Sequence, residues 1–92
     1  MNKMVRQKFA YIKEKYQVQG IRWLRLSPGK SIDDGVFILL HKEVSKTCMY
    51  DYWFEDIEIA EKWAEKYFGV KPSDWQSAED LLSKGIQIYD EM

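Results

Sequence analysis

The spacing of apolar residues changes once along the chain, close to residue 56. Before that point, three segments are predicted as β-strands. Residues 21–26 (IRWLRL) and 48–55 (CMYDYWFE) alternate in character, as strands with two different faces do, whereas residues 36–41 (VFILLH) are apolar on both faces. A strand that is apolar on both faces is typical of the middle of a sheet, so we expect segment 36–41 to be central.

After residue 56 the apolar residues follow the period of an α-helix. They recur at steps of three and four, and the stripe consists of Ile57, Ala60, Ala64 and either Tyr67 or Phe68. Asp56 is suited to cap the first turn of this helix, and Gly69 to end it. A second, short helix is predicted after the SAED sequence at 77–80, which has the spacing of a capping box, and this helix should end at Gly85.

Two segments fit more than one structure. Residues 9–16 (FAYIKEKY) have helical spacing, but the aromatic FAYI and the following QVQG favour a hairpin into segment 21–26. Residues 86–92 (IQIYDEM) alternate as a last strand would, although the short helix could instead continue through Gly85. The strand is favoured in both segments.

These elements predict an α+β fold in two layers. We expect three or four antiparallel strands, covered on one face by one main helix, with a short second helix near the C-terminus. The length of 92 residues fits one domain that spans the whole chain. Trp63 and Trp75 are expected to pack in or beside its core, where aromatic side chains bury a large area for their number.

The composition offers few groups for catalysis or for metal binding. Cys48 is the single cysteine and His41 the single histidine, so neither an internal disulfide nor a thiolate metal site is expected. The adjacent acidic pairs, such as Glu79 and Asp80, are typical of caps or solvated charge. We therefore predict a protein that is not an enzyme, with no catalytic residues, no metal and no cofactor.

The chain also lacks the signals of a membrane or secreted protein. Its first residues (MNKMVRQKF) have no apolar region of the kind found in a secretory signal. The longest apolar run is VFILL at 36–40, far shorter than the ~20 residues that a membrane-spanning helix needs. We therefore expect a cytoplasmic protein with no membrane partner.

The aromatic segment 48–55 points to a binding surface. Its even positions, from Cys48 to Phe54, carry no charge and are expected to lie under the helix, whereas Trp53 shares the other face with two acids. An aromatic residue within a polar rim is typical of the centre of a protein–protein interface. The candidate partner-binding residues are Trp53, Asp51, Glu55, Glu58, Trp23, Asp33 and Asp34.

The charge is distributed unevenly along the chain. Residues 1–30 carry eight Lys or Arg against one Glu, a balance of +7, whereas residues 31–92 carry six Lys against fourteen Asp or Glu, a balance of −8. The two halves could neutralise each other in the fold. An acidic face that remained exposed would instead attract a basic partner and repel nucleic acid.

The segment DYWFEDIEIAEKWAEKYFGVKPSDW resembles a group of small bacterial proteins in which an aromatic, acidic strand leads into a helix that ends in Phe-Gly-Val, followed by Asp-Trp. The matching positions are Asp51, Trp53, Asp56, Ala60, Phe68, Gly69, Val70, Asp74 and Trp75. The resemblance concerns residues that shape the fold. Some proteins of this build are similar to immunity proteins, which bind a toxin domain and block it, and this resemblance implies a protein partner.

Two functions are favoured, and a small enzyme that uses Cys48 or His41 is a third possibility. The first is a protein-binding module, most concretely an immunity or inhibitor protein that blocks a basic toxin or nuclease domain by steric occlusion and acidic complementarity. The alternative is a small module for RNA or single strands, in which Trp23 and Trp53 stack on bases. The acids beside Trp53 disfavour the alternative, because phosphate contacts dominate affinity for nucleic acid.

Overall fold

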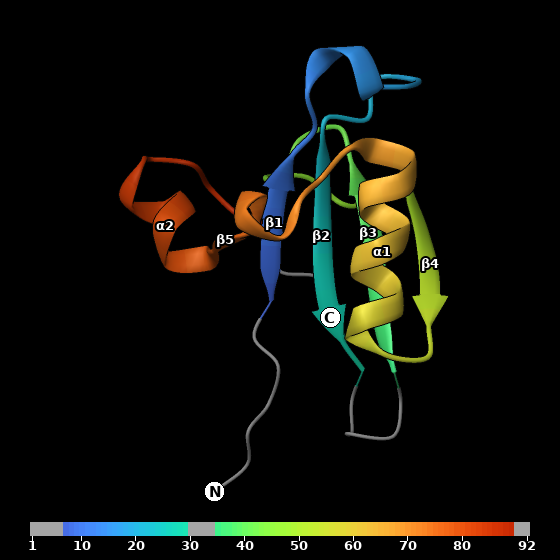
Figure 1. Ribbon diagram of the computed structural model, residues 1–92. Helices are drawn as coiled ribbons and strands as arrows, with labels where there is room; N and C mark the ends of the chain where they lie inside the picture. Colours follow the sequence, from blue (N-terminus) through green and yellow to red (C-terminus); the bar gives the residue numbers. More distant parts are fainter. Residues whose placement is uncertain (1–6, 30–34, 90–92) are drawn as a thin grey trace, which may run out of the picture.

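Five strands and two helices make up the part of the chain that the computed structural model describes, residues 7–29 and 35–89 (Figure 1). The elements, in chain order, are β1 (Lys8–Tyr11), a 3-10 turn η1 (Glu14–Tyr16), β2 (Trp23–Pro28), β3 (Val36–His41), β4 (Tyr50–Phe54), α1 (Ile57–Phe68), a 3-10 turn η3 (Pro72–Asp74), β5 (Gln76–Ser77) and α2 (Ala78–Ser83). The sheet has the order β4-β3-β2-β1-β5, and all its pairs are antiparallel.

The α+β class and the antiparallel sheet agree with the sequence analysis, but the number of strands is five, where three or four were expected. The additional strand is β5, which consists of two residues that pair with Lys8 and Phe9. Its sequence is too short to show an alternating pattern. Only its pairing with β1 makes it a strand.

Helix α1 forms for local reasons and then covers one face of the sheet. The Asp56 side chain accepts a hydrogen bond from the Ile59 amide at 2.9 Å, as expected for an N-cap. Gly69 ends the helix in the left-handed conformation, with φ at 66°. A side chain there would also meet the ring of Tyr16, since an added Cβ would lie 2.4 Å from it.

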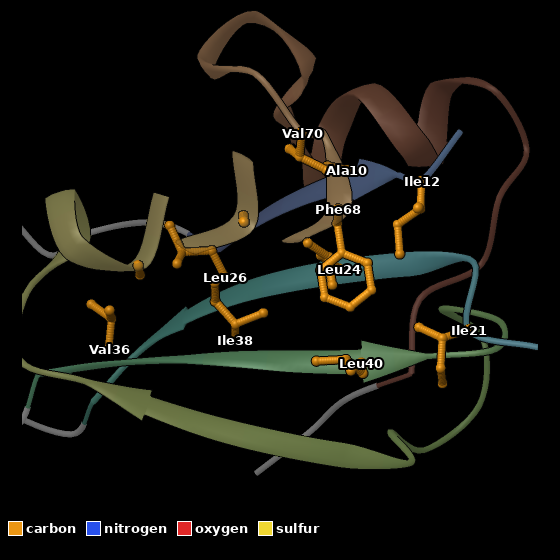
Figure 2. Close-up of a cluster of buried hydrophobic side chains, with 12 residues drawn as sticks. Ala10, Ile12, Ile21, Leu24, Leu26, Val36, Ile38, Leu40, Phe68 and Val70 are labelled. Carbon is orange, nitrogen blue, oxygen red and sulfur yellow. The ribbon is translucent and has the colours of Figure 1, made fainter. Parts of the chain in front are cut away.

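The main core lies between α1 and the sheet (Figure 2). Its twelve buried residues come from the helix stripe, from the inward side of the central strands and from the connections beside them: Ala10, Ile12, Ile21, Leu24, Leu26, Val36, Ile38, Leu40, Ala60, Ala64, Phe68 and Val70. Trp63 and Trp75 pack against this cluster, half-buried, as the sequence analysis expected. Of the two residues proposed to end the stripe, Phe68 is buried and Tyr67 is exposed.

The opposite face of the sheet carries a second, smaller core. Phe9, Val44 and Leu81 are buried there, and Trp23, Ala78, Ile86 and Ile88 pack against them. This cluster joins β1, the connection between β3 and β4, helix α2 and the chain that follows α2. The sheet is therefore covered on both faces, although it was expected to be covered on one.

The segment after α2 is the main error of the sequence analysis. Residues 86–89 form neither a strand nor a continuation of the helix, because α2 ends at Ser83 and the chain turns at Gly85. They run instead across the second face, where the amide of Tyr89 donates to the carbonyl of Val44 at 2.6 Å. Residues 90–92 lie outside the described part of the chain.

The ambiguous segment 9–16 is resolved in favour of the strand. β1 pairs with β2 in an antiparallel register that places Phe9 opposite Arg25. The turn predicted at QVQG exists, since the amide of Ile21 donates to the carbonyl of Val18 at 2.8 Å. The helical spacing corresponds only to the short turn η1.

Candidate functional site

Strand β4 is the edge of the sheet within the described residues, and it has two different faces. The register places Trp53 opposite Phe37 and Asp51 opposite Leu39, on the face away from α1. Tyr50 and Tyr52 lie on the face that α1 covers in part. The two faces of β4 are described in turn below.

On the face away from α1, the structure places Trp53 and Asp51 at the surface. The Trp53 side chain is 54% exposed, and Asp51 and Glu55 are exposed beside it. The indole also lies against Gly35, where an added Cβ would be 2.7 Å from the Trp53 Nε1. The predicted combination of an exposed tryptophan and neighbouring acids is therefore present on this part of β4.

Trp23 does not join that surface. It is opposite His41 in the register, at the other end of the sheet from the pair of Phe37 and Trp53. It is half-buried in the second core, and its ring packs edge-on against Tyr11 with centroids 5.2 Å apart. The two tryptophans share one face of the sheet but not one exposed patch.

Arg25, on the same face of β2 as Trp23, is buried, with only 2% of its surface exposed. Its Nη1 donates to the carbonyl of Tyr89 at 2.5 Å, and its Nε and Nη2 donate to Gln7 Oε1. The guanidinium also lies over the ring of Phe9, 5.1 Å from its centroid. These contacts make Arg25 an internal link between the sheet and the segment that covers it.

Glu58 is not part of the surface around Trp53. Glu58 is exposed in the first turn of α1, which lies on the opposite side of the sheet from Trp53. Asp33 and Asp34 lie outside the described residues. Of the predicted set, the structure therefore places Trp53 and Asp51 on one face of β4, and the exposed Glu55 just after the end of that strand.

On the α1 face, β4 carries an aromatic surface that the sequence analysis assigned to the core. Tyr50 and Tyr52 are 48% and 47% exposed. Tyr52 packs against Trp63 with ring centroids 5.1 Å apart, and Trp63 also contacts Phe54 and Tyr67. Helix α1 thus contacts β4 through one large side chain, that of Trp63, and leaves Tyr50 and Tyr52 about half exposed.

A groove of about 340 Å³ lies beside these aromatic rings. Its walls are formed by Val18, Gln19, Ile21, Leu40, Tyr50, Tyr52, Trp63 and Phe68. Gln19 on the rim is a non-glycine residue with a positive φ of 53°, and its Oε1 accepts a hydrogen bond from the Tyr50 hydroxyl at 3.5 Å. A residue in this sparsely populated backbone region is often found at a functional site.

The alternating pattern of β4 gave no sign of this groove, because an uncharged face of a strand is ordinarily core. The position of β4 at the edge decides the matter, and the alternation within β4 does not show that position.

The single histidine is part of the fold. His41 is fully buried, and its Nδ1 lies 2.9 Å from the carbonyl oxygen of Lys46, within the connection from β3 to β4. Cys48, in the same connection, is half-buried. Among the residues that the structure describes, no group of three or more His, Cys, Asp or Glu side chains is arranged to hold a metal ion.

Within residues 7–29 and 35–89, neither helix combines the length and the apolar character needed to cross a membrane. Comparison of the chain with models of protein families, with curated proteins and with solved structures finds no match.

Proposed function

We propose that this protein is a non-enzymatic protein-binding module that contacts its partner through Trp53, Asp51 and Glu55. The observation that carries the proposal is the 54% exposure of Trp53 on an edge strand, with the exposed Asp51 on the same face of that strand. Large aromatic side chains supply much of the affinity at protein interfaces, and a polar rim excludes water around them. An exposed tryptophan with an acidic rim fits that description.

The partner is a basic protein surface. Asp51 and Glu55 would pair with its Lys or Arg side chains, and the acidic balance of residues 31–92 would accelerate the encounter. The most concrete version is an immunity or inhibitor protein that occludes a basic toxin or nuclease domain. This version is supported by the sequence resemblance described above and by the position of the acids beside Trp53.

A module for single-stranded nucleic acid is the alternative. Such modules stack successive bases on neighbouring aromatic rings and hold the phosphates with cations. Here Trp23 is half-buried away from Trp53, Arg25 is buried, and Asp51 and Glu55 stand beside the exposed indole. These placements favour the protein partner.

The experiment begins with a photo-crosslinker at position 51, applied in a lysate of the host cell, and mass spectrometry of the cross-linked protein. The purified partner is then titrated by calorimetry against the native chain and against Trp53→Ala combined with Asp51→Lys. The double variant should lose about 2–4 kcal/mol of binding free energy, as expected when a hot-spot residue is removed.

A control variant is Tyr11→Ala, which removes a half-exposed aromatic side chain from the same face but at the other end of the sheet. It should bind as the native chain does. Loss of thermal stability in Trp53→Ala with unchanged partner affinity would show that Trp53 has a structural role only. A shift of a fluorescent single-stranded oligonucleotide at low salt would favour the alternative.

A further inference from the structure

The outer side of β4 has little of the protection that edge strands usually carry. Natural edge strands are often protected by Lys, Pro, a bulge or a covering element, since an open edge can pair with another chain. β4 (YDYWF) contains neither Lys nor Pro, it is the terminal strand of the sheet in the described residues, and Asp51 is its single charged residue. This edge is suited to accept an added strand.

The hydrogen-bond pattern indicates how the backbone of β4 is oriented. The amide of Gly29 donates to the carbonyl of Gly35 at 2.9 Å, which makes this pair a hydrogen-bonded pair in the register of β2 and β3. Alternation through β3 then directs the carbonyl of Leu40 toward β4, where it accepts from the Met49 amide at 2.7 Å. By the same alternation, the N–H and C=O of Asp51 point away from β3.

The side chains beside this edge define what an added strand must carry. On the α1 face, its residues would lie next to Tyr50 and Tyr52, whose half-exposed rings present apolar surface. On the other face, they would lie next to the carboxylate of Asp51, and Glu55 follows the end of the strand. Since successive residues of a strand point to opposite faces, the matching segment alternates apolar and basic residues.

We propose that the edge of β4 binds an extended, alternating apolar and basic segment of the partner as a sixth strand. Its apolar side chains pack against the exposed rings of Tyr50 and Tyr52, and its Lys or Arg side chains pair with Asp51 and, beyond the end of β4, with Glu55. This inference rests on the proposed function, whose basic partner it describes in more detail. A second copy of the chain fits less well, because the strand that it would add, residues 50–54, has an acid and no base.

The first test uses synthetic peptides, so that it does not depend on the identity of the partner. A blocked seven-residue peptide that alternates Lys and Val is titrated at low ionic strength and followed by hydrogen exchange and NMR. The expected result is slower exchange of the Asp51 amide, together with shifts of the Tyr52 and Trp63 resonances. A peptide of the same composition with Lys and Val in two blocks should give neither effect, because neither of its faces is apolar along the whole strand.

The contribution of the charge of Asp51 and that of the aromatic surface around Tyr52 are then tested separately. Replacement of every Lys in the peptide by Glu should weaken binding about tenfold or more. In the Asp51→Lys variant, this preference for the Lys peptide over the Glu peptide should disappear. Tyr52→Lys places a charge beside the groove on an already half-exposed side chain, so the variant should fold but lose affinity for the alternating peptide about tenfold or more. The matched control is Tyr11→Lys, away from the β4 edge, which should bind the peptide as the native chain does.

Three results would overturn the inference. The first is unchanged exchange of the Asp51 amide at saturating peptide. The second is equal binding of the alternating and block peptides. The third is a mass of twice the 11.0 kDa of the chain in light scattering, abolished by Tyr52→Lys, which would assign the edge to a second copy. A natural partner that needs Trp53 but is indifferent to Tyr52→Lys would keep the proposed function and reject the added strand.

Discussion

The two faces of the sheet are closed in different ways. One face is covered by α1, which inserts small and aromatic side chains into a core of twelve buried residues. The other face is covered by the connection around Val44, by α2 and by residues 86–89, which contribute few buried side chains. Part of that second cover is held by hydrogen bonds instead, from Arg25 to Tyr89 and from Tyr89 to Val44.

The difference follows from where the two covers lie along the chain. α1 directly follows β4, so the helix and the strands beneath it come from one continuous stretch of sequence. The contact between Arg25 and Tyr89 spans 64 positions. Neither cover extends fully over β4, which is why the aromatic residues of this strand remain exposed on both sides. The candidate binding surface thus exists because two unequal covers end at the same edge.

The largest difference in stability between the two faces is expected when one isoleucine on each face is replaced by alanine. Ile38→Ala empties a fully buried position under α1 and should lower the free energy of unfolding by about 2–5 kcal/mol. Ile88→Ala removes a half-buried side chain from the second cover and should cost about 1 kcal/mol, since much of its surface is already in water. Urea denaturation of both variants measures the two values, and equal losses would refute the distinction.

Arg25→Met tests the polar link on the second face. The methionine keeps an apolar stem but removes the hydrogen bonds to Tyr89 and Gln7, and the expected loss is about 1.5–3 kcal/mol because the donor is charged. Hydrogen exchange should show residues 86–89 released while the amides of β3 keep most of their protection. Equal loss of protection in β3 would mean that the two covers form one cooperative unit.

The helix caps provide a smaller and more local comparison. Asp56→Ala removes the cap of α1 and should lower the free energy of global unfolding by about 1 kcal/mol, which is typical for the loss of an N-cap. Ser77→Ala removes the cap of α2, whose Oγ accepts from the Asp80 amide at 3.1 Å. Because α2 lies at the border of the second core, this change should appear mainly as faster exchange within α2. Thermal unfolding and hydrogen exchange of the two variants distinguish global from local effects.

The smallest effect on stability is expected for Trp53→Ala. More than half of this side chain is exposed, so its removal should change the free energy of unfolding by about 0.5–1 kcal/mol, close to the range of surface substitutions. Trp63→Ala is the matched variant on the α1 face and should cost several times more, since its ring contacts four other aromatic rings. Similar losses for both tryptophans would place Trp53 in the core.

The sequence analysis was accurate where an element depends on its neighbours in the chain. The cap at Asp56, the left-handed Gly69 and the buried positions Ala60 and Ala64 were all identified from spacing. The capping box at Ser77 and Asp80 is also present, with both of its hydrogen bonds. These features depend on residues that lie a few positions apart in the chain, so the local sequence is sufficient to predict them.

The errors arose where a residue's surroundings come from distant parts of the chain. The alternation of residues 86–92 favoured a strand, yet residues 86–89 cover the second face as an irregular segment. The uncharged face of β4 favoured burial, yet Tyr50 and Tyr52 are half-exposed. A period-two pattern shows that a segment has two faces and does not show what lies above either of them.

The sequence by itself therefore determined the elements with a clear local pattern and the chemistry of their faces: β2, β3 and β4, the main helix with its ends, and the placement of Trp53 and Asp51 together on one side of β4. The tertiary structure alone decided which of these side chains water can reach. Exposure depends on the order of the strands and on the segments that cover the sheet, which are contacts between residues far apart in the chain. For that reason Trp23 is packed under the second cover, and Trp53, on the same face, stands at an open edge.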